Sequence, residues 1–318
     1  MKNQTTKGRL MSLLLGLLIF TLPVQAQYYG GNGKIEIGLG VGPMFALTDL
    51  GGSAGIGRGF LKDLDVPQAK ASAGVYVTAH PTEWFGIRVA ATIGSVAAND
   101  ADAPNKGGAE IFRIERNLHF RSTIKEAYAA IEFYPTVFFE QYTELVGKFR
   151  PYGVAGIGVY NFNPEVRDVD GSWVKTQALR LEGQGFAEYP NSKPYELTQI
   201  NLIGGIGFKY YVSNTMYIGT EVLYRKLMTD YLDDVSQAYY IDPIHFDQYL
   251  PAAQAEQARR LYYRGTFSYP TTRPYSEFEQ RGDPTQNDSY FSTTVRLGFR
   301  LGGNGNGKTP RGQRCPVF

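Results

Sequence analysis

Hydrophobic and polar residues alternate along residues 290–301, whose sequence is YFSTTVRLGFRL. Successive side chains of a β-strand point to opposite faces, so this alternation predicts a strand with one apolar and one polar face. The apolar face carries Phe291, Thr293, Val295, Leu297, Phe299 and Leu301, and the polar face carries Tyr290, Ser292, Thr294, Arg296, Gly298 and Arg300. A tilted strand crosses a bilayer with about 9–11 residues. A soluble sandwich strand shows the same alternation, so recurrence of the pattern decides between the two.

Seven further stretches have the composition and alternation of strands. They are residues 34–43, 70–80, 84–96, 123–134, 150–162, 198–212 and 215–226. The stretch at 150–162 is rich in glycine, so the sequence does not indicate which of its faces is apolar. The chain contains 23 Tyr, 19 Phe and 37 Gly, a composition that suits strands and turns better than helices. The pattern therefore predicts an all-β fold with eight strands.

Short and long links alternate between these stretches. Residues 81–83 and 213–214 form short links, and residues 135–148 form a moderate one. The four long links are residues 44–69, 97–122, 163–197 and 227–289. Outer-membrane barrels of Gram-negative bacteria have short periplasmic turns and long outer loops. We therefore expect an eight-stranded antiparallel transmembrane outer-membrane β-barrel with long extracellular loops and both termini in the periplasm.

The first 26 residues have the features of a secretory signal peptide. Three basic residues precede an apolar run at 10–22, and the small residue Ala26 follows. We expect cleavage after Ala26, a barrel over 27–301 and a tail over 302–318. No later segment has the roughly 18 consecutive apolar residues of a membrane-spanning helix. Removing the signal peptide leaves 29 basic and 30 acidic residues, a balance that argues against nucleic-acid binding.

Aromatic residues gather at the strand ends that we assign to the periplasm. They are Trp84, Phe85, Tyr134, Tyr152, Tyr210, Tyr211, Tyr217 and Phe299. Transmembrane barrels carry aromatic girdles where the wall meets the membrane interface. We therefore expect these residues to form an aromatic girdle at the periplasmic interface of the membrane.

Charged residues occupy the polar faces of the predicted strands. They are Lys34, Glu36, Arg88, Glu126, Glu132, Lys209, Glu221, Arg225, Arg296 and Arg300. The interior of an eight-stranded barrel is just wide enough for side chains to fill it. Charges that leave water must pair, and both signs are present in near balance. We expect a packed core of ion pairs, and the alternative is a charged pore for small solutes.

The last long link contains three aspartates within five residues. Asp230, Asp233 and Asp234 flank Tyr231 in an outer-loop motif whose carboxylates could bind calcium. A capped, solvated turn is the simpler interpretation of the same residues, and we favour it. Residues 251–263 of this link have helix-forming composition, with a proline at the permitted first turn.

Signals for catalysis are weak. Residues 51–55 read GGSAG and match the nucleophile elbow in letters, which would make Ser53 a candidate nucleophile. That motif needs a strand, a sharp turn and a helix, whereas Ser53 falls in a glycine-rich loop. The three histidines, His80, His119 and His245, have no spacing suited to a metal site or a catalytic triad. We therefore expect no enzymatic activity and no cofactor; a lipid-modifying enzyme would rest on Ser53 alone.

Five segments, in the same order along the chain, carry a resemblance to a known family. They are RNLHFR at 116–121, PYGVAGIGVYNFNP at 151–164, LEGQG at 181–185, YRKLMTDYLDDVS at 224–236 and RGDPTQNDSY at 281–290. The chain resembles the PorG-type outer-membrane barrels of the type IX secretion system, which exports proteins and serves gliding motility. The resemblance implies a structural barrel that anchors a periplasmic ring made of a lipoprotein and its partner.

The tail after the last strand is expected to reach such a partner. A glycine-rich linker at 302–307 precedes Lys308, Arg311 and Arg314, and Cys315 follows them. An odd cysteine in an exported protein suggests an intermolecular disulfide or a reactive thiol. The basic residues would steer the tail toward an acidic surface, which the resemblance suggests is the ring lipoprotein. A tail with an incidental cysteine is the alternative.

Overall fold

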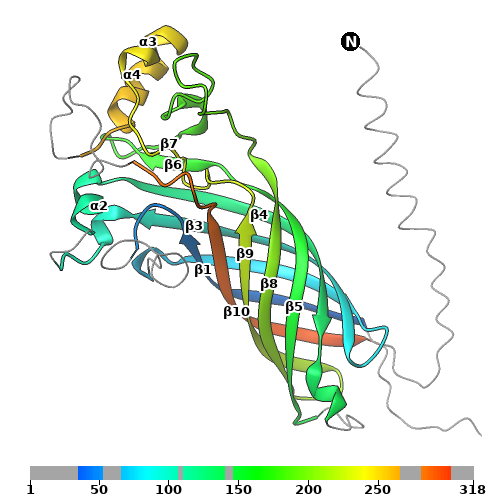
Figure 1. Cartoon of the computed structure of the whole chain (residues 1–318). Coiled ribbons are helices and arrows are strands. Elements are labelled where there is room, and N and C mark those ends of the chain that lie inside the picture. Colours follow the sequence, from blue (N-terminus) through cyan, green and yellow to red (C-terminus); the bar gives the residue numbers. More distant parts are fainter. Residues whose placement is uncertain (1–34, 53–65, 107–109, 140–145, 266–280, 302–318) are drawn as a thin grey trace, which may run out of the picture. The chain divides into compact units, whose positions relative to one another are not determined.

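A computed structural model describes residues 35–52, 66–106, 110–139, 146–265 and 281–301. These residues belong to one compact unit, residues 33–318. The signal peptide and the tail, with Lys34, Lys308, Arg311, Arg314 and Cys315, lie outside the described residues. Eight long strands dominate the unit (Figure 1). They are β1 (Ile35–Leu47), β2 (Lys70–Ala79), β3 (Phe85–Asn99), β4 (His119–Phe133), β5 (Phe149–Asn161), β8 (Thr198–Tyr211), β9 (Met216–Leu227) and β10 (Ser289–Leu301).

The eight strands form a closed antiparallel barrel. Each pairs with its neighbours in the order β3-β2-β1-β10-β9-β8-β5-β4, and β3 pairs with β4 to close the circle. The seam between the first and last strands aligns Leu39 with Leu297 and Val41 with Val295. The predicted fold class is confirmed. β1, β3 and β4 extend three or four residues further toward the long links than the alternation alone predicted.

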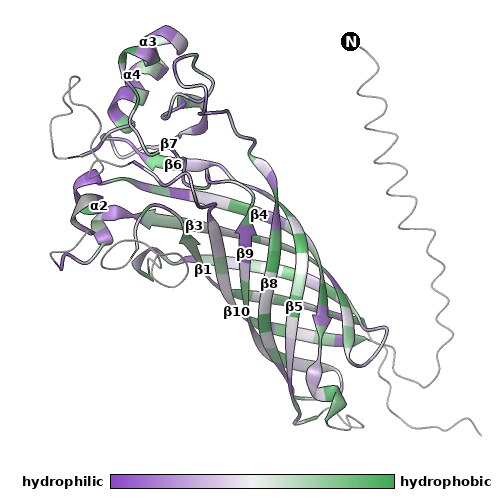
Figure 2. Ribbon diagram, in the orientation of Figure 1, coloured by the Kyte–Doolittle hydropathy of each residue, from purple (hydrophilic) through white to green (hydrophobic). Residues whose placement is uncertain are grey.

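Alternation along each strand sorts its side chains between wall and lumen. On β2, Val75 and Val77 are 61% and 48% exposed, whereas Tyr76 between them is 5% exposed. Figure 2 shows hydrophobic residues recurring along the barrel strands. The same division holds on β10, where Val295 and Phe299 face outward and Arg296 is buried. The lumen side is therefore polar and the outer wall apolar, as the sequence predicts.

The girdle prediction was wrong for half of its members. Trp84, Tyr210 and Phe299 do face outward, and Trp84 packs against Phe133 and Phe138 near the short links. Tyr134, Tyr152, Tyr211 and Tyr217 are instead buried in the lumen. These four tyrosines have the strand parity of the charged residues, and their hydroxyl groups need the hydrogen-bond partners that the lumen provides.

The four long links fold together at one end of the barrel (Figure 1). We call their described residues within 48–69, 100–118, 162–197 and 228–288 the cap. The cap contains α2 (Glu110–Arg116), β6 (Pro164–Arg167), β7 (Trp173–Lys175), α3 (Ile244–Tyr249) and α4 (Ala252–Leu261), with short 3-10 turns η2 (Val66–Gln68), η3 (Asp100–Asp102) and η5 (Gln177–Leu179). The remaining turn, η4 (Pro135–Phe138), lies in the moderate link between β4 and β5. None of the helices in the described residues is long and apolar enough to cross a membrane.

The cap has a hydrophobic core of its own. Phe186 is buried together with Phe246 of α3 and Leu261 of α4. α4 follows Pro251, so the predicted helix forms, with the proline just before its first residue. The β6–β7 hairpin extends the barrel sheet, because Glu165 of β6 pairs with Arg121 of β4.

A second cluster of buried side chains joins the cap to the barrel mouth. Tyr290 of β10 packs edge-on against Tyr160 of β5, which stacks on Phe162. Phe162 stacks on Tyr195, and Tyr195 stacks on Tyr231 with ring centroids 4.7 Å apart. This aromatic column runs from the lumen into two different links, so packing holds the cap on the barrel.

Candidate functional site

An ion-pair network crosses the lumen. Arg88 of β3 contacts Glu132 of the adjacent β4 at 2.5 Å and Glu221 of β9 at 2.7 Å. β3 and β9 are four strands apart in the circle of eight, so the pair between Arg88 and Glu221 joins opposite walls. Arg296 of β10 also pairs with Glu221. Because these side chains meet in the middle, they occupy the lumen at this level.

A second group of charges lies toward the short links. The Lys209 ammonium of β8 contacts Glu36 of β1 at 2.5 Å, Glu132 at 3.2 Å and the Tyr134 hydroxyl at 2.6 Å. An ammonium has three N–H donors, and these contacts use all three. His80 also lies 3.2 Å from Glu36. This group fills the lumen between the first group and the short-link end.

A third group lies near the cap. Arg225 of β9 contacts Glu126 of β4 at 3.1 Å and the Ser292 hydroxyl at 2.5 Å. Asn201 and Tyr290 donate hydrogen bonds to Glu126 at 2.8 and 3.0 Å. Side chains of three other strands thus converge on the Glu126 carboxylate, so the cap end of the lumen is closed as well.

The structure thereby places the predicted interior charges. Glu36, Arg88, Glu126, Glu132, Lys209, Glu221, Arg225 and Arg296 are all buried in the lumen, and Arg300 is half-buried at the short-link end. Removing one member of a buried pair leaves the other charge uncompensated, a cost of about 3–5 kcal/mol. The network therefore makes the closed lumen costly to open.

Sequence reasoning missed one charged member of the lumen. Arg150 is 5% exposed and lies over the Tyr134 ring at 4.2 Å. It belongs to the glycine-rich strand β5, whose facing the alternation did not reveal. The hydroxyls of Tyr76 and Tyr217 lie 2.8 Å apart, and the Arg296 guanidinium lies over the Tyr76 ring at 3.5 Å. The alternation along β2 and β9 placed both tyrosines on the strand faces that carry the charged residues.

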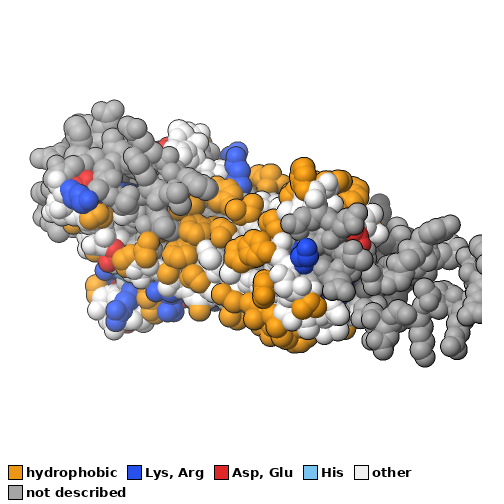
Figure 3. Space-filling model, turned by 90° about the horizontal axis from the view of Figure 1, so that it is seen from below, with side chains coloured by type: hydrophobic (Ala, Val, Ile, Leu, Met, Phe, Trp, Pro, Cys, Tyr) orange, Lys and Arg blue, Asp and Glu red, His pale blue; other side chains and the backbone are white. Residues whose placement is uncertain are grey.

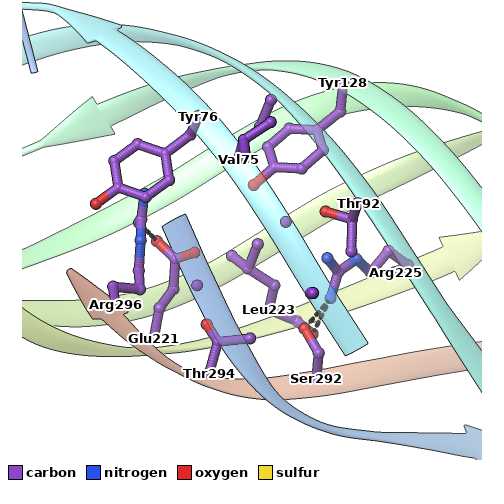
Figure 4. Close-up of a pocket in the computed structure, with 14 residues that line it drawn as sticks. Val75, Tyr76, Thr92, Tyr128, Glu221, Leu223, Arg225, Ser292, Thr294 and Arg296 are labelled. Carbon is purple, nitrogen blue, oxygen red and sulfur yellow. Dashed lines mark hydrogen bonds and ion pairs between the residues drawn. The ribbon is translucent and has the colours of Figure 1, made fainter. Parts of the chain in front are cut away.

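Figure 4 shows one cavity within this packing. Tyr76 of β2, Glu221 and Arg225 of β9 and Arg296 of β10 project toward it, and Thr92 lines it as well. Its volume is about 30 Å³, which is room for about two water molecules. A cavity of this size hydrates polar groups and is too small to act as a solute pathway.

A second set of buried charges holds the cap together. The Asp100 carboxylate accepts hydrogen bonds from the Gly51 and Leu118 amides, each at 3.0 Å, and pairs with Arg116 at 2.8 Å. Arg116 also donates to the carbonyl of Asp49 at 2.7 Å and to the carbonyl of Arg281. One ion pair thus joins the first, second and fourth long links.

Glu182 joins the third link to the fourth. Its carboxylate is fully buried and accepts hydrogen bonds from the Ser236 and Gln237 amides at 3.0–3.1 Å. The Arg281 guanidinium pairs with it at 2.9 Å and also donates to the carbonyls of Tyr262 and Asp234. Burial nonetheless raises the pKa of Glu182 to about 7, although Arg281 opposes the shift.

The aspartate motif is buried, which corrects our expectation of a solvated turn. Asp230, Asp233 and Asp234 are 8%, 1% and 1% exposed. Asp233 accepts a hydrogen bond from the Val235 amide at 2.9 Å, and Asp234 accepts one from the Tyr195 hydroxyl at 2.7 Å. The packing of the other links over the turn excludes water from it, which the local sequence does not reveal.

Burial also raises the pKa values of these carboxyl groups. Burial raises the pKa of Asp234 to about 6, against the opposing effects of the Tyr195 hydrogen bond and Arg281. Burial, together with the neighbouring carboxylate of Asp49, also raises the pKa of Asp230 and Asp233. Asp288, which accepts a hydrogen bond from the Leu232 amide at 2.8 Å, has a raised pKa for the same reason. The motif is therefore partly protonated near neutral pH.

The described residues offer no arrangement of three or more His, Cys, Asp or Glu side chains that could hold a metal ion. Tyr231, the fourth member of the motif, stacks on Tyr195 in the aromatic column. The motif thus contributes hydrogen bonds and ring packing between links. Ser53, on which the enzymatic alternative rests, lies outside the described residues.

Four of the five segments that carry the resemblance contribute residues to the buried charged groups of the cap. Arg116 comes from 116–121, Glu182 from 181–185, Asp234 from 224–236 and Arg281 from 281–290. The fifth segment, 151–164, contributes Phe162 to the adjoining aromatic column. The segments that carry the resemblance therefore supply the contacts that fasten the outer links to one another.

No protein-family model and no curated protein matches the sequence. Similar solved structures include Neisserial surface protein A, with a TM-score of 0.38 and 8% identity over 86% of this chain and 100% of that one. OprG from Pseudomonas aeruginosa gives a TM-score of 0.36 and 10% identity, covering 85% and 97% of the two chains. Ail of Yersinia pestis gives 0.35 and 8% over 86% and 100%. These similarities concern the barrel fold alone.

Proposed function

We propose that the chain is an integral outer-membrane barrel that is closed in its lumen and serves as a structural component of a type IX secretion apparatus. The observation that carries the proposal is the ion-pair network, in which Arg88 and Glu221 meet from opposite walls at 2.7 Å. A barrel with a filled lumen offers rigidity and two exposed ends, which suits an anchor. It is poorly suited to the alternative role, a small-solute channel.

The outer wall supports placement in a membrane. Its exposed side chains on the described strands are largely hydrophobic, and Figure 3 shows them covering the visible wall of the barrel. Three charged side chains face outward from the eight strands: Arg121 and Lys125 of β4 and Lys226 of β9. All three lie toward the cap end. An uncharged apolar band about 25 Å tall is what a transmembrane barrel presents to lipid.

The difference in length between the links at the two ends of the barrel supports the orientation of the barrel in the membrane. Outer-membrane barrels carry their long loops outside the cell and their short turns in the periplasm. By that rule the cap lies outside, the links at 81–83 and 213–214 lie in the periplasm, and an even strand number puts both termini there. Epitope tags at Lys193 in the cap and at Thr82 test this orientation. Antibody on intact cells should label the first tag and leave the second unlabelled, and the reverse pattern would invert the barrel.

The secretion role rests on the resemblance of the five segments to PorG-type barrels. Its support from the present chain is that four of these segments join in one buried cluster. A periplasmic ring lipoprotein is the proposed partner. The proposed link is the tail, where Cys315 would form a disulfide and Lys308, Arg311 and Arg314 would steer it toward an acidic surface.

Cross-linking and affinity capture from native membranes test the role. A tagged wild-type chain should recover a periplasmic lipoprotein, and deleting the gene should abolish export of secreted proteins. On non-reducing gels we expect a band of higher mass that collapses with reductant and is missing in Cys315→Ser. Quantitative alkylation of Cys315 in unreduced membranes would refute the disulfide. Normal export after deletion would refute the secretion role.

A further inference from the structure

One of the outward-facing basic residues has no partner among the described residues. Lys125 of β4 lies beside Ile93 of β3 and Asn161 of β5, and it makes no ion pair or hydrogen bond within the described residues. Arg121, two positions closer to the cap on the same face, is different. It pairs with Glu165 at 2.9 Å and lies over the Trp173 ring at 3.9 Å. Lys125 is therefore available to an anion that approaches from the membrane.

A groove in the outer wall begins at this lysine. Its volume is about 720 Å³, and its lining is apolar apart from one end. Ala73, Ala91 and Ala127 lie in the groove among larger residues such as Val75, and small side chains on neighbouring strands leave the wall hollow. Ala91 and Ala127 are directly paired across β3 and β4, so the hollow spans the two strands.

The polar end of the groove is formed by Lys125, Asn161 and Thr198. These residues lie on three successive strands, β4, β5 and β8. Asn161 donates hydrogen bonds to the Leu197 carbonyl and the Thr198 hydroxyl at 3.1 and 2.9 Å, which fixes this rim. The groove therefore has a cation and amide at one end and hydrocarbon along its length.

This combination fits an amphipathic anion. An ammonium forms charge-assisted hydrogen bonds with phosphate oxygens, and an alanine-lined hollow accepts a hydrocarbon chain. We propose that Lys125 and this groove bind one phosphorylated lipid of the surrounding outer leaflet, with a phosphate at the Lys125 ammonium and an acyl chain against Ala91 and Ala127. The inference rests on the membrane placement in the proposed function and is independent of the secretion role.

Charge complementarity favours a lipid of the leaflet at the cap end. The outward-facing charges of the eight strands are all basic and all lie toward that end. Free phosphate would use Lys125 and leave the hydrophobic length of the groove empty. An uncharged lipid would fill the groove and leave Lys125 without an anion. A phosphorylated lipid satisfies both parts of the site.

Native mass spectrometry of the folded full-length barrel tests the site. The barrel is titrated with bisphosphorylated lipid A, with its phosphate-free form and with inorganic phosphate. Three variants are compared with wild type. Lys125→Gln removes the cation, Ala91→Leu fills the groove without changing charge, and Lys226→Gln is the matched control. Lys226 also faces outward near the cap, but it lies on β9, three strands away from β4.

We expect Lys125→Gln and Ala91→Leu each to weaken binding of bisphosphorylated lipid A by about tenfold, as loss of one charge-assisted contact or of the chain site implies. Lys226→Gln should bind like wild type, and the phosphate-free lipid should bind wild type as weakly as Lys125→Gln binds the phosphorylated one. Equal weakening in Lys125→Gln and Lys226→Gln would mean general attraction to anionic lipid and would overturn the site.

Two further outcomes separate the possible failures. Full competition by inorganic phosphate, with no effect of Ala91→Leu, would indicate an anion site without a lipid and would overturn the proposal. Heat-modifiable gel migration after insertion into lipid vesicles verifies folding of every variant. Failure of the wild type to insert would refute the membrane barrel itself, whereas a folded barrel without lipid selectivity would refute only this inference.

Discussion

The lumen and the cap both bury charges, but they balance them differently. In the lumen, each of the four glutamates contacts a basic side chain within about 3 Å. The cap buries eight carboxylates, those of Asp100, Glu110, Asp168, Glu182, Asp230, Asp233, Asp234 and Asp288. Arg116, Arg281 and Arg260 pair with Asp100, Glu182 and Asp168. Asp230, Asp233, Asp234 and Asp288 make no ion pair within the described residues. Ion pairs therefore stabilise the lumen, whereas the stability of the cap also depends on protonation of buried carboxyl groups.

This difference shows how one chain combines a rigid barrel with a cap whose stability depends on pH. Charges of opposite sign that meet across a lumen fix the strands in one arrangement. Carboxylates that lack a cation are stable in a buried site while they are protonated. We therefore expect the barrel to be insensitive to pH near neutrality and the cap to be sensitive to it.

The largest expected effect comes from breaking the lumen network with Arg88→Met. The change leaves Glu132 and Glu221 without the guanidinium that bridges them, and we expect a loss of about 3–5 kcal/mol in the free energy of unfolding. Urea titration of the barrel in lipid vesicles, followed by gel mobility, measures the loss. Arg259→Met in the cap, where Arg259 pairs with the exposed Asp247, is the control and should cost under about 1 kcal/mol. A similar small cost for Arg88→Met would mean that the network does not hold the barrel.

Arg281→Met should have a smaller effect that is confined to the cap. Glu182 would lose its guanidinium but would keep the Ser236 and Gln237 amides, and its carboxyl can take up a proton. We expect a local cost of about 1–3 kcal/mol, seen as faster proteolysis of the cap while the barrel keeps its folded mobility. Faster unfolding of the barrel itself would show that cap and lumen are one cooperative unit.

The effect of pH on the stability of the cap should be the next smaller one. The pKa of Asp234 is raised to about 6 and that of Glu182 to about 7, so the folded cap binds protons more tightly than the unfolded one. Stability from these groups is fully present below about pH 4 and is lost as pH rises through about 6–7. Fluorescence of Trp173 in a Trp84→Phe variant should show a cap melting temperature that falls between pH 5 and pH 8. A rising melting temperature over that range would contradict the account.

The smallest expected effect is that of Asp230→Asn. Because burial raises the pKa of Asp230, the neutral amide resembles the protonated carboxyl that the folded cap prefers. We expect a change of less than about 1 kcal/mol at pH 6 and slight stabilisation at pH 8. Asp170→Asn, at an exposed position, is the control. Destabilisation by Asp230→Asn at pH 8 would indicate that the ionised form is the native one.

Alternation predicted most of the barrel because a strand records its two faces locally. The alternation gave wrong or no assignments where a residue type suits both faces of a strand. Tyrosine suits both an interface and a polar lumen, so Tyr134 and Tyr217 were assigned to the girdle although their parity matched that of the charges. The glycines of β5 hid the facing of Arg150. The β6–β7 hairpin went unpredicted because strands of three and four residues leave almost no periodicity.

The cap could not be predicted because its contacts are distant in sequence. The segments containing Arg116, Glu182 and Arg281 were recognised one by one, yet nothing local indicates that loops about 65 and 100 residues apart meet. The acidic motif looked solvated for the same reason. Its burial depends on Tyr195 and Arg281, which come from other parts of the chain.

The closed lumen is the central claim, and conductance in planar lipid bilayers tests it most directly. Purified barrel, inserted and verified by its heat-modifiable mobility, should add no stable ion conductance above that of the bare membrane, because Arg88, Glu221 and their neighbours fill the lumen. Stable, voltage-independent conductance steps from the wild-type barrel, scaling with salt concentration, would contradict the account and favour a small-solute channel.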